Sequence, residues 1–146
     1  LGALYERKGA LDSALAAYRE AMNDPAYEAS ASNSAAWLLV NDRNDPRSAL
    51  DLAARALELQ PEDPHIQDTY GWIQHQLGDS EKAVQHLRKA RAALPGSATV
   101  RYHLGAALLT LGRVDEARSE LENALTISET FPEADAAREL LRPLKP

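Results

Sequence analysis

A 34-residue spacing recurs along this chain and constrains its fold more than any other feature of the sequence. It joins four pairs of small residues: Gly71 and Gly105, Gly78 and Gly112, Ala83 and Ala117, and Ala90 and Ala124. Repeats of about 20 to 50 residues are typical of solenoids, in which each unit buries its apolar face by stacking on its neighbours. We therefore expect a row of equivalent units along the chain.

Two earlier copies extend the repeat towards the N-terminus. Ala49, Ala56 and Pro61 lie one period before Ala83, Ala90 and Pro95, and the first copy has Gly2, Tyr5, Gly9, Ala14, Tyr18 and Ala21 at the same internal positions. The interval from Gly2 to Ala36 equals the period, but the interval from Ala14 to Ala49 is longer by one. One residue is therefore inserted between Ala36 and Ala49, and the polar turn 41–48 is the expected place.

The composition indicates that each unit is built from helices. Hydrophobic residues make up 45% of the chain, but many of them are Ala and aromatic residues are only 5%, which favours closely packed helices. Val, Ile and Thr are sparse, and no segment shows the sustained alternation of a strand. The expected fold class is all-α, with helices at 1–8, 12–23, 29–41, 47–59, 64–77, 80–93, 98–111 and 114–127.

Glycine has two distinct roles in this pattern. Gly71 is expected where the two helices of a pair come closest, because a side chain there would push them apart. Gly78 is expected just after the first helix, in the left-handed conformation that glycine adopts without a steric penalty. At the helix starts, Asp63 before Pro64 and Ser97 are the predicted N-caps.

These positions resemble the tetratricopeptide repeat (TPR), a family of 34-residue units. The third copy carries the pattern as Tyr70-Gly71, Gly78, Ala83, Leu87, Ala90 and Pro95, and the fourth as Leu104-Gly105, Leu108, Gly112, Ala117, Leu121 and Ala124. The departures are Glu129 in place of a terminal Pro, an early Pro25, and Gln74 in place of a large residue. The resemblance implies one domain, a right-handed superhelix (α-solenoid) of antiparallel helix pairs, with repeats at 1–28, 29–63, 64–97 and 98–131 and a capping helix at 132–142.

The residues after the last repeat predict this capping helix independently. Thr130 and Glu133 fit a capping box that would open it, and Pro143 would close it. The apolar residues expected to cover the last repeat are Phe131, Ala134, Ala137 and Leu141. We expect a native C-terminus here, whereas Leu1 falls inside a predicted helix, as in a segment cut from a longer protein.

In the TPR family the first helix of each pair lines a concave groove, the usual site for a peptide or a helix of a partner protein. In the third repeat one face of this helix carries His65, Asp68, Thr69, Trp72, His75 and Gln76. The counterparts in the neighbouring repeats are Asn33, Ser34 and Trp37, and Tyr102 and His103. The predicted partner-binding groove consists of Asn33, Trp37, His65, Asp68, Thr69, Trp72, His75, Tyr102 and His103.

Trp37 and Trp72 are the predicted aromatic centre of this groove. Since adjacent packed helices lie about 8–10 Å apart, we expect the two rings within about 10 Å of each other and both partly exposed. Packing of the rings between adjacent inner helices is the alternative interpretation. Asn33, Asp68 and His103 are expected to bond a backbone laid along the groove, or else to form a solvated face.

A narrower resemblance concerns segments 34–39, 45–79 and 100–117. They are similar to the C-terminal repeats of large bacterial TPR proteins, some of them lipoproteins linked to exopolysaccharide and PEP-CTERM protein-sorting systems. This resemblance implies a periplasmic or envelope location in a Gram-negative bacterium.

Other classes of function lack support in the sequence. The net charge is −6 and Lys and Arg are scattered, which argues against nucleic-acid binding. No apolar run approaches the roughly 20 residues of a membrane span, so we expect no membrane insertion in this segment. His65 and His75 lie about 15 Å apart along one helix and the chain has no Cys, so we expect no metal and no other cofactor. No residues are arranged as a catalytic site, and we expect no enzyme activity.

The leading hypothesis is therefore a protein-interaction scaffold that docks a peptide or helix in its groove. The alternative is a structural spacer or self-assembling segment of a longer solenoid, which associates through its incomplete N-terminal repeat. The Lys/Arg/Asn clamp by which some TPR domains bind a C-terminal carboxylate is absent, since its positions hold His65, Asp68, Thr69 and His103.

Overall fold

The computed structural model describes residues 10–144, which form helices joined by short turns. The elements are α2 (Leu11–Ala21), α3 (Glu28–Asn41), α4 (Pro46–Leu59), α5 (Pro64–Gln76), α6 (Ser80–Ala93), α7 (Ala98–Thr110), α8 (Val114–Ile127), α9 (Ala134–Leu141) and the 3-10 helix η1 (Arg142–Leu144). This part of the chain contains no strand, and the all-α prediction is confirmed. α2 to α8 begin and end within two residues of the predicted bounds. The helix predicted at 1–8 lies outside the described residues.

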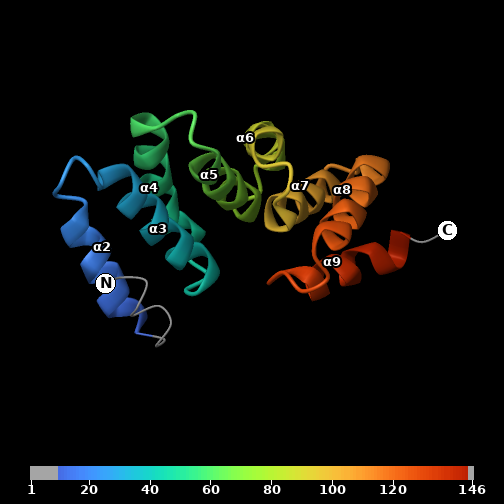
Figure 1. Ribbon diagram of the computed structural model, residues 1–146, viewed down its shortest axis with the longest axis horizontal. Coiled ribbons are helices and arrows are strands. Elements are labelled where there is room, and N and C mark those ends of the chain that lie inside the picture. Colours follow the sequence, from blue (N-terminus) through green and yellow to red (C-terminus); the bar gives the residue numbers. More distant parts are fainter. Residues whose placement is uncertain (1–9, 145–146) are drawn as a thin grey trace.

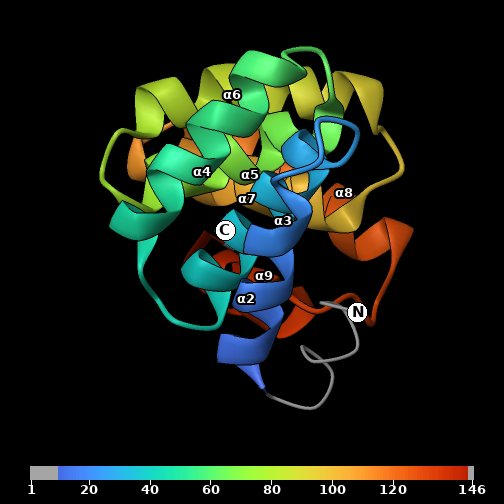
Figure 2. The ribbon, with the colours of Figure 1, turned by 90° about the vertical axis from the view of Figure 1, so that its left-hand side faces the viewer.

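The helices follow one another as pairs along an arc (Figure 1). The inner side of the arc is formed by α3, α5 and α7. Along this side α5 contacts both α3 and α7. Their partners α4, α6 and α8 lie on the outer side, and the end-on view shows α4 and α6 as a separate layer (Figure 2). α2 and α9 stand at the two ends of the arc. α3, α5 and α7 therefore present one continuous surface, to which each of the three described helix pairs contributes one helix.

Two glycines set the distance between the helices of a pair. A Cβ atom at Gly71 would lie 2.8 Å from Leu87 Cγ and 3.2 Å from the carbonyl oxygen of Ala83. At Gly105 it would lie 2.7 Å from Leu121 Cγ. Both positions lie where the helices cross, which confirms the predicted role of these glycines.

The turns that end the inner helices need a backbone conformation with positive φ. Gly78 (φ 92°) and Gly112 (φ 72°) supply it after α5 and α7. After α3 the corresponding turn contains Asn44 at φ 50°, within the segment predicted to hold the inserted residue. The side chain of Asp45 then caps α4 by accepting a hydrogen bond from the backbone N–H of Ser48 at 3.1 Å.

Both predicted N-caps of the inner helices are confirmed. Asp63 Oδ1 accepts hydrogen bonds from the backbone N–H groups of His65 and Ile66, at 2.8 and 3.2 Å. Ser97 Oγ accepts one from the backbone N–H of Val100 at 3.3 Å. These caps occupy donors that have no partner inside the helix and fix where α5 and α7 begin.

The capping helix is present, but the capping box predicted to open it is wrong. α9 begins at Ala134, and its N-cap residue, Glu133, makes no side-chain cap bond. The physical reason is Pro132, which disfavours helical geometry at Phe131 and so delays the helix. The carboxylate of Glu133 instead accepts a hydrogen bond from Thr99 Oγ1 at 2.9 Å.

The predicted apolar face of α9 does cover the last repeat. Its buried residues and those of the last repeat form one cluster: Phe131, Ala134, Ala137 and Leu141 with Ala98, Leu121 and Ala124. This contact supplies the neighbour that a terminal repeat otherwise lacks.

Candidate functional site: a groove along the inner helices

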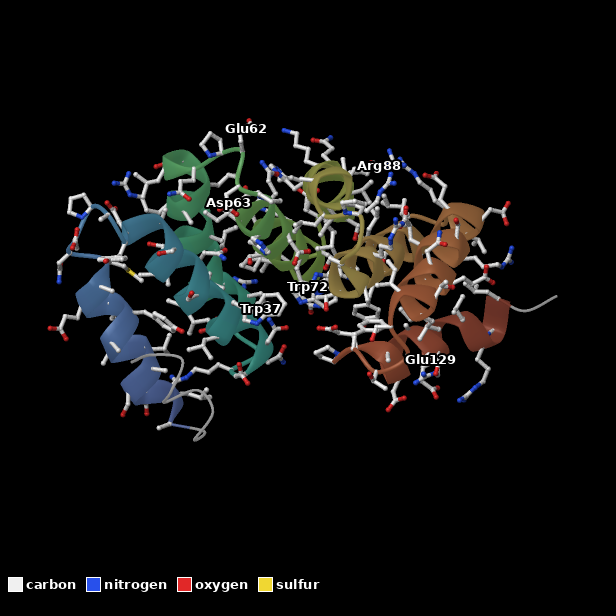
Figure 3. The ribbon with its side chains drawn as sticks, in the orientation of Figure 1. Trp37, Glu62, Asp63, Trp72, Arg88 and Glu129 are labelled. Carbon is white, nitrogen blue, oxygen red and sulfur yellow. The ribbon has the colours of Figure 1, made fainter. Side chains whose placement is uncertain are left out.

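A pocket of about 350 Å³ opens on the inner side of the arc. Its lining residues are Tyr18, Asn33, Ser34, Trp37, His65, Asp68, Thr69, Ser97, Thr99 and Val100, which come from α2, α3, α5 and the start of α7. Five of the nine predicted groove residues are among them: Asn33, Trp37, His65, Asp68 and Thr69. Trp37 and Trp72 lie close together towards the inner side, whereas Glu62 and Arg88 lie on the outer side (Figure 3).

The two tryptophans differ in exposure, which corrects the prediction for one of them. Trp37 is partly exposed, as expected. Trp72 is only 9% exposed and belongs to the core. Its indole stacks on the imidazole of His103, with ring centroids 4.2 Å apart and planes inclined by 21°. α7 thus covers the face of Trp72 that periodicity along α5 alone assigned to the groove.

His103 is the centre of an aromatic cluster beneath the pocket. The ring of Trp37 lies 5.7 Å from it, and Tyr102 contacts Trp72 at 5.9 Å. The imidazole of His103 lies 5.7 Å from the indole of Trp37 and 4.2 Å from that of Trp72, measured between ring centroids. Because both indoles are so close to one ring, their own centroids lie within about 10 Å of each other. The predicted proximity of the two rings is therefore confirmed. The cluster joins α3, α5 and α7, so it fixes the relative positions of three inner helices.

Asp68 and His103 bond to each other, not to the open groove as the sequence suggested. His103 Nδ1 lies 2.8 Å from Asp68 Oδ1, and His103 is 1% exposed. An ionised carboxylate only accepts hydrogen bonds, so His103 donates from Nδ1. This contact occupies one oxygen of Asp68 and removes His103 from the predicted binding surface.

Thr69, His75 and Tyr102 are buried to different extents: Thr69 lines the pocket but is 3% exposed, whereas His75 and Tyr102 are partly exposed. Thr69 is buried and donates its hydroxyl to the carbonyl of His65 at 3.0 Å. His75 Nδ1 lies 3.1 Å from Ser80 Oγ, and burial, aided by the nearby His103, lowers the pKa of His75. Burial, with the nearby Glu133 carboxylate, raises the pKa of the Tyr102 hydroxyl, and the side chain packs against the apolar cluster that joins the last repeat to α9. The imidazole of His75 and the phenol of Tyr102 are therefore uncharged at neutral pH.

Asn33 lines the pocket, and its side-chain oxygen has no hydrogen-bond partner among the described residues. This Oδ1 atom is shielded from solvent. A buried acceptor without a donor costs free energy. A guest in the pocket can supply that donor once the amide of Asn33 turns towards it.

Two models of the tetratricopeptide repeat match the sequence, one over residues 35–98 and the other over residues 74–142. The chain belongs to the tetratricopeptide-repeat family. No curated protein gives a significant sequence match to this TPR chain. TPR domains are protein-interaction scaffolds that are generally non-enzymatic, and this domain belongs to that general class.

Solved structures similar to this TPR domain agree on the fold. MamA superposes with a TM-score of 0.75 at 20% identity, over 96% of this chain and 81% of its own. YrrB, described as a TPR protein with an unusual peptide-binding site, superposes with a TM-score of 0.73 at 20% identity. The match covers 94% of this chain and 71% of YrrB. The first TPR domain of human RPAP3 superposes with a TM-score of 0.69 at 18% identity, over 83% of this chain and 94% of that domain. At these identities the likeness establishes an all-α TPR solenoid.

Some other features of the described residues bear on function. Between residues 10 and 144, no three His, Cys, Asp or Glu side chains are grouped so that they could hold a metal ion. Within the same range, no helix of this TPR domain has the length and apolar character needed to cross a membrane.

Four of the ten lining residues had no predicted place in the groove: Ser97, Thr99 and Val100 at the beginning of α7, and Tyr18 on the outer-type helix α2. Ser34, the predicted counterpart of Thr69, lies in the pocket but was not among the nine predicted binding residues. The repeat itself carried a signal for Thr99, which lies one period after His65. No such signal identifies Tyr18, because it belongs to α2 and lines the pocket only through the packing of α2 against α3.

The difference between the two tryptophans predicts a result in fluorescence quenching. In the TPR domain with Trp72→Phe, the remaining Trp37 should be quenched readily by iodide, because its ring is partly exposed. In the domain with Trp37→Phe, the remaining Trp72 should have a Stern–Volmer constant at least threefold smaller, as it is 9% exposed. Equal constants for the two variants would contradict the placement of Trp72 beneath His103.

Proposed function

We propose that the inner groove binds a peptide or helical segment of a partner protein, with one side chain of that segment inserted into the pocket between α3 and α5. The observation that carries this proposal is the pocket itself, in which the partly exposed indole of Trp37 lies near the unpartnered Asn33 amide. Trp and Tyr are frequent anchors of protein interfaces because a rigid ring supplies much contact area at little entropic cost.

The size of the pocket supports a single inserted side chain. Small-molecule sites span about 300–1,000 Å³, and this pocket, at about 350 Å³, lies at the lower end. The rest of a bound segment would lie along α3, α5 and α7. Asn33 can hydrogen-bond to such a segment, because a peptide backbone carries both donors and acceptors. YrrB, which has the same fold, is described as having a peptide-binding site, and this is consistent with such a role.

Trp37→Ala is the variant that tests this function. Peptides would be selected from a random 12-residue phage-display library on the wild-type domain, and their affinities measured by fluorescence anisotropy. We expect Trp37→Ala to weaken their binding by about 2 kcal/mol, roughly 30-fold, as truncation of an interface anchor does. Asn33→Ala should weaken it less, since it removes one hydrogen-bonding group and little contact area.

The matched control is Leu59→Ala, which truncates an exposed apolar side chain at the end of the outer helix α4. Its affinity should equal that of the wild type. Thermal melts followed by circular dichroism establish that each variant is folded at the assay temperature. If the selected peptides bind the Trp37, Asn33 and Leu59 variants equally well, the groove is not the binding site. Light scattering across concentrations then tests whether the segment self-assembles.

A further inference from the structure

We propose that the pocket selects a cationic side chain, an arginine or lysine of the partner segment. This inference rests on the proposed function and specifies the guest of the same pocket. It depends on the charges of the inner helices, on two acceptors without a hydrogen-bond partner among the described residues, and on the aromatic wall.

The inner helices are nearly free of basic side chains. Across α3, α5 and α7 the only Lys or Arg is Arg101. Arg101 is occupied elsewhere, since Nη1 contacts Glu120 Oε2 at 2.7 Å and Nε donates to the carbonyl of Pro95 at 3.1 Å. Among residues 10–144, no Lys or Arg lines the pocket. This part of the chain therefore offers no cation to an anionic guest.

The acidic groups near the pocket favour a cation. Of the two carboxylates on the inner helices, Glu28 is paired with Arg55 at 2.8 Å. Asp68 lines the pocket and forms no ion pair with a Lys or Arg of the described residues; its Oδ1 contacts His103 Nδ1. The side chain of Asp68 is 12% exposed, so it remains accessible from the pocket. A further carboxylate, Glu133, accepts a hydrogen bond from Thr99, which lines the pocket.

The pocket also offers acceptors that are not used. Asn33 Oδ1 has no partner, and Asp68 Oδ2 makes no hydrogen bond within the described residues. An ammonium group has three donors and a guanidinium has five, and neither has an acceptor. Such a group can donate to the accessible carboxylate of Asp68, and also to Asn33 Oδ1 once that amide turns towards the pocket. The indole of Trp37 adds a cation–π contact, for which Trp is the strongest of the aromatic side chains.

The test is an NMR titration of the ¹⁵N-labelled domain. The probes are the Nα-acetyl N-methylamides of arginine and lysine, of citrulline as the neutral isostere of arginine, and of aspartate as the anion. The reporter is the indole N–H signal of Trp37, assigned with Trp37→Phe. We expect both cations to shift this signal saturably at millimolar concentrations. Citrulline should bind at least tenfold more weakly, and aspartate should not shift the signal.

Asp68→Asn should weaken binding of the arginine probe at least tenfold. The new amide keeps an oxygen that can accept from His103 Nδ1, so the cluster is retained. The matched control is Asp51→Asn, which removes the same charge from an exposed position on the outer helix α4 and should leave the affinity unchanged. Asn33→Ala is a second variant, independent of the Asp68–His103 contact, and should weaken arginine binding about threefold or more.

Two results of the titration each overturn the inference. The first is citrulline or aspartate shifting the Trp37 signal as strongly as arginine, and the second is unchanged affinity in Asp68→Asn. If phage-selected peptides depend on Trp37 but are not enriched in Arg or Lys, the groove function stands and the cationic guest is wrong. If the arginine probe binds the pocket but no selected peptide depends on Trp37, the cation site stands and the proposed peptide groove fails.

Discussion

Trp72→Ala is expected to lower the free energy of unfolding by about 3–5 kcal/mol, the range for truncating a buried tryptophan. The indole is 9% exposed and stacks on His103, so its loss leaves a cavity between α5 and α7. A partly exposed ring, as the sequence predicted for Trp72, would lose less buried surface on truncation and would cost less stability. Urea denaturation followed by circular dichroism measures the difference.

The control for Trp72→Ala is Trp37→Ala in the same assay. Trp37 is partly exposed, so its truncation removes less buried surface and should cost clearly less stability. If both variants unfold at the same urea concentration, then Trp72 is not in the core, and the stacking on His103 is wrong.

Gly105→Leu should destabilise the domain by about 2–4 kcal/mol, because a large side chain overpacks the crossing of α7 and α8. A Cβ at this position already lies 2.7 Å from Leu121 Cγ and 2.9 Å from Leu121 Cδ2. Leu121 is fully buried and cannot move aside without displacing its neighbours. The measurement is again urea denaturation at equilibrium.

Gly96→Ala is the matched control for this glycine variant. A Cβ at Gly96 would meet no atom within 4 Å, so the domain should unfold within about 0.5 kcal/mol of the wild type or be slightly more stable. A Gly105→Leu variant as stable as Gly96→Ala would mean that the helices do not cross closely at Gly105.

Asp68 connects the stability of the repeats with the proposed selectivity of the groove. Its Oδ1 binds His103 of the next inner helix, and its side chain also lines the pocket. In a repeat protein each unit is stabilised mainly by its neighbours. The contact that joins α5 to α7 therefore also holds the carboxylate in place for a guest, which is a form of preorganisation.

The sequence by itself determined the helices, their pairing and the points of closest approach. These features depend on local signals, and the 34-residue spacing repeats them, so each copy supports the assignment of the next. Gly71 and Gly105 recur because a crossing leaves no room for a Cβ. Gly78 and Gly112 recur because the turn requires positive φ. Such constraints act within one pair of helices and are visible in its residues. The box at Thr130 failed for an equally local reason, the effect of Pro132 on Phe131.

Only the tertiary structure decided which residues of the inner face remain open. Trp37 and Trp72 occupy equivalent positions, yet one is partly exposed and the other is covered by His103. Periodicity places both rings on the same face of their helices. It does not predict which side chains of the next repeat cover that face. Likewise Asp68 bonds to a residue of the next repeat, and Tyr18 reaches the pocket from outside the inner layer. Exposure, hydrogen-bond partners and pocket walls depend on contacts between repeats, and these contacts exist only once the solenoid has formed.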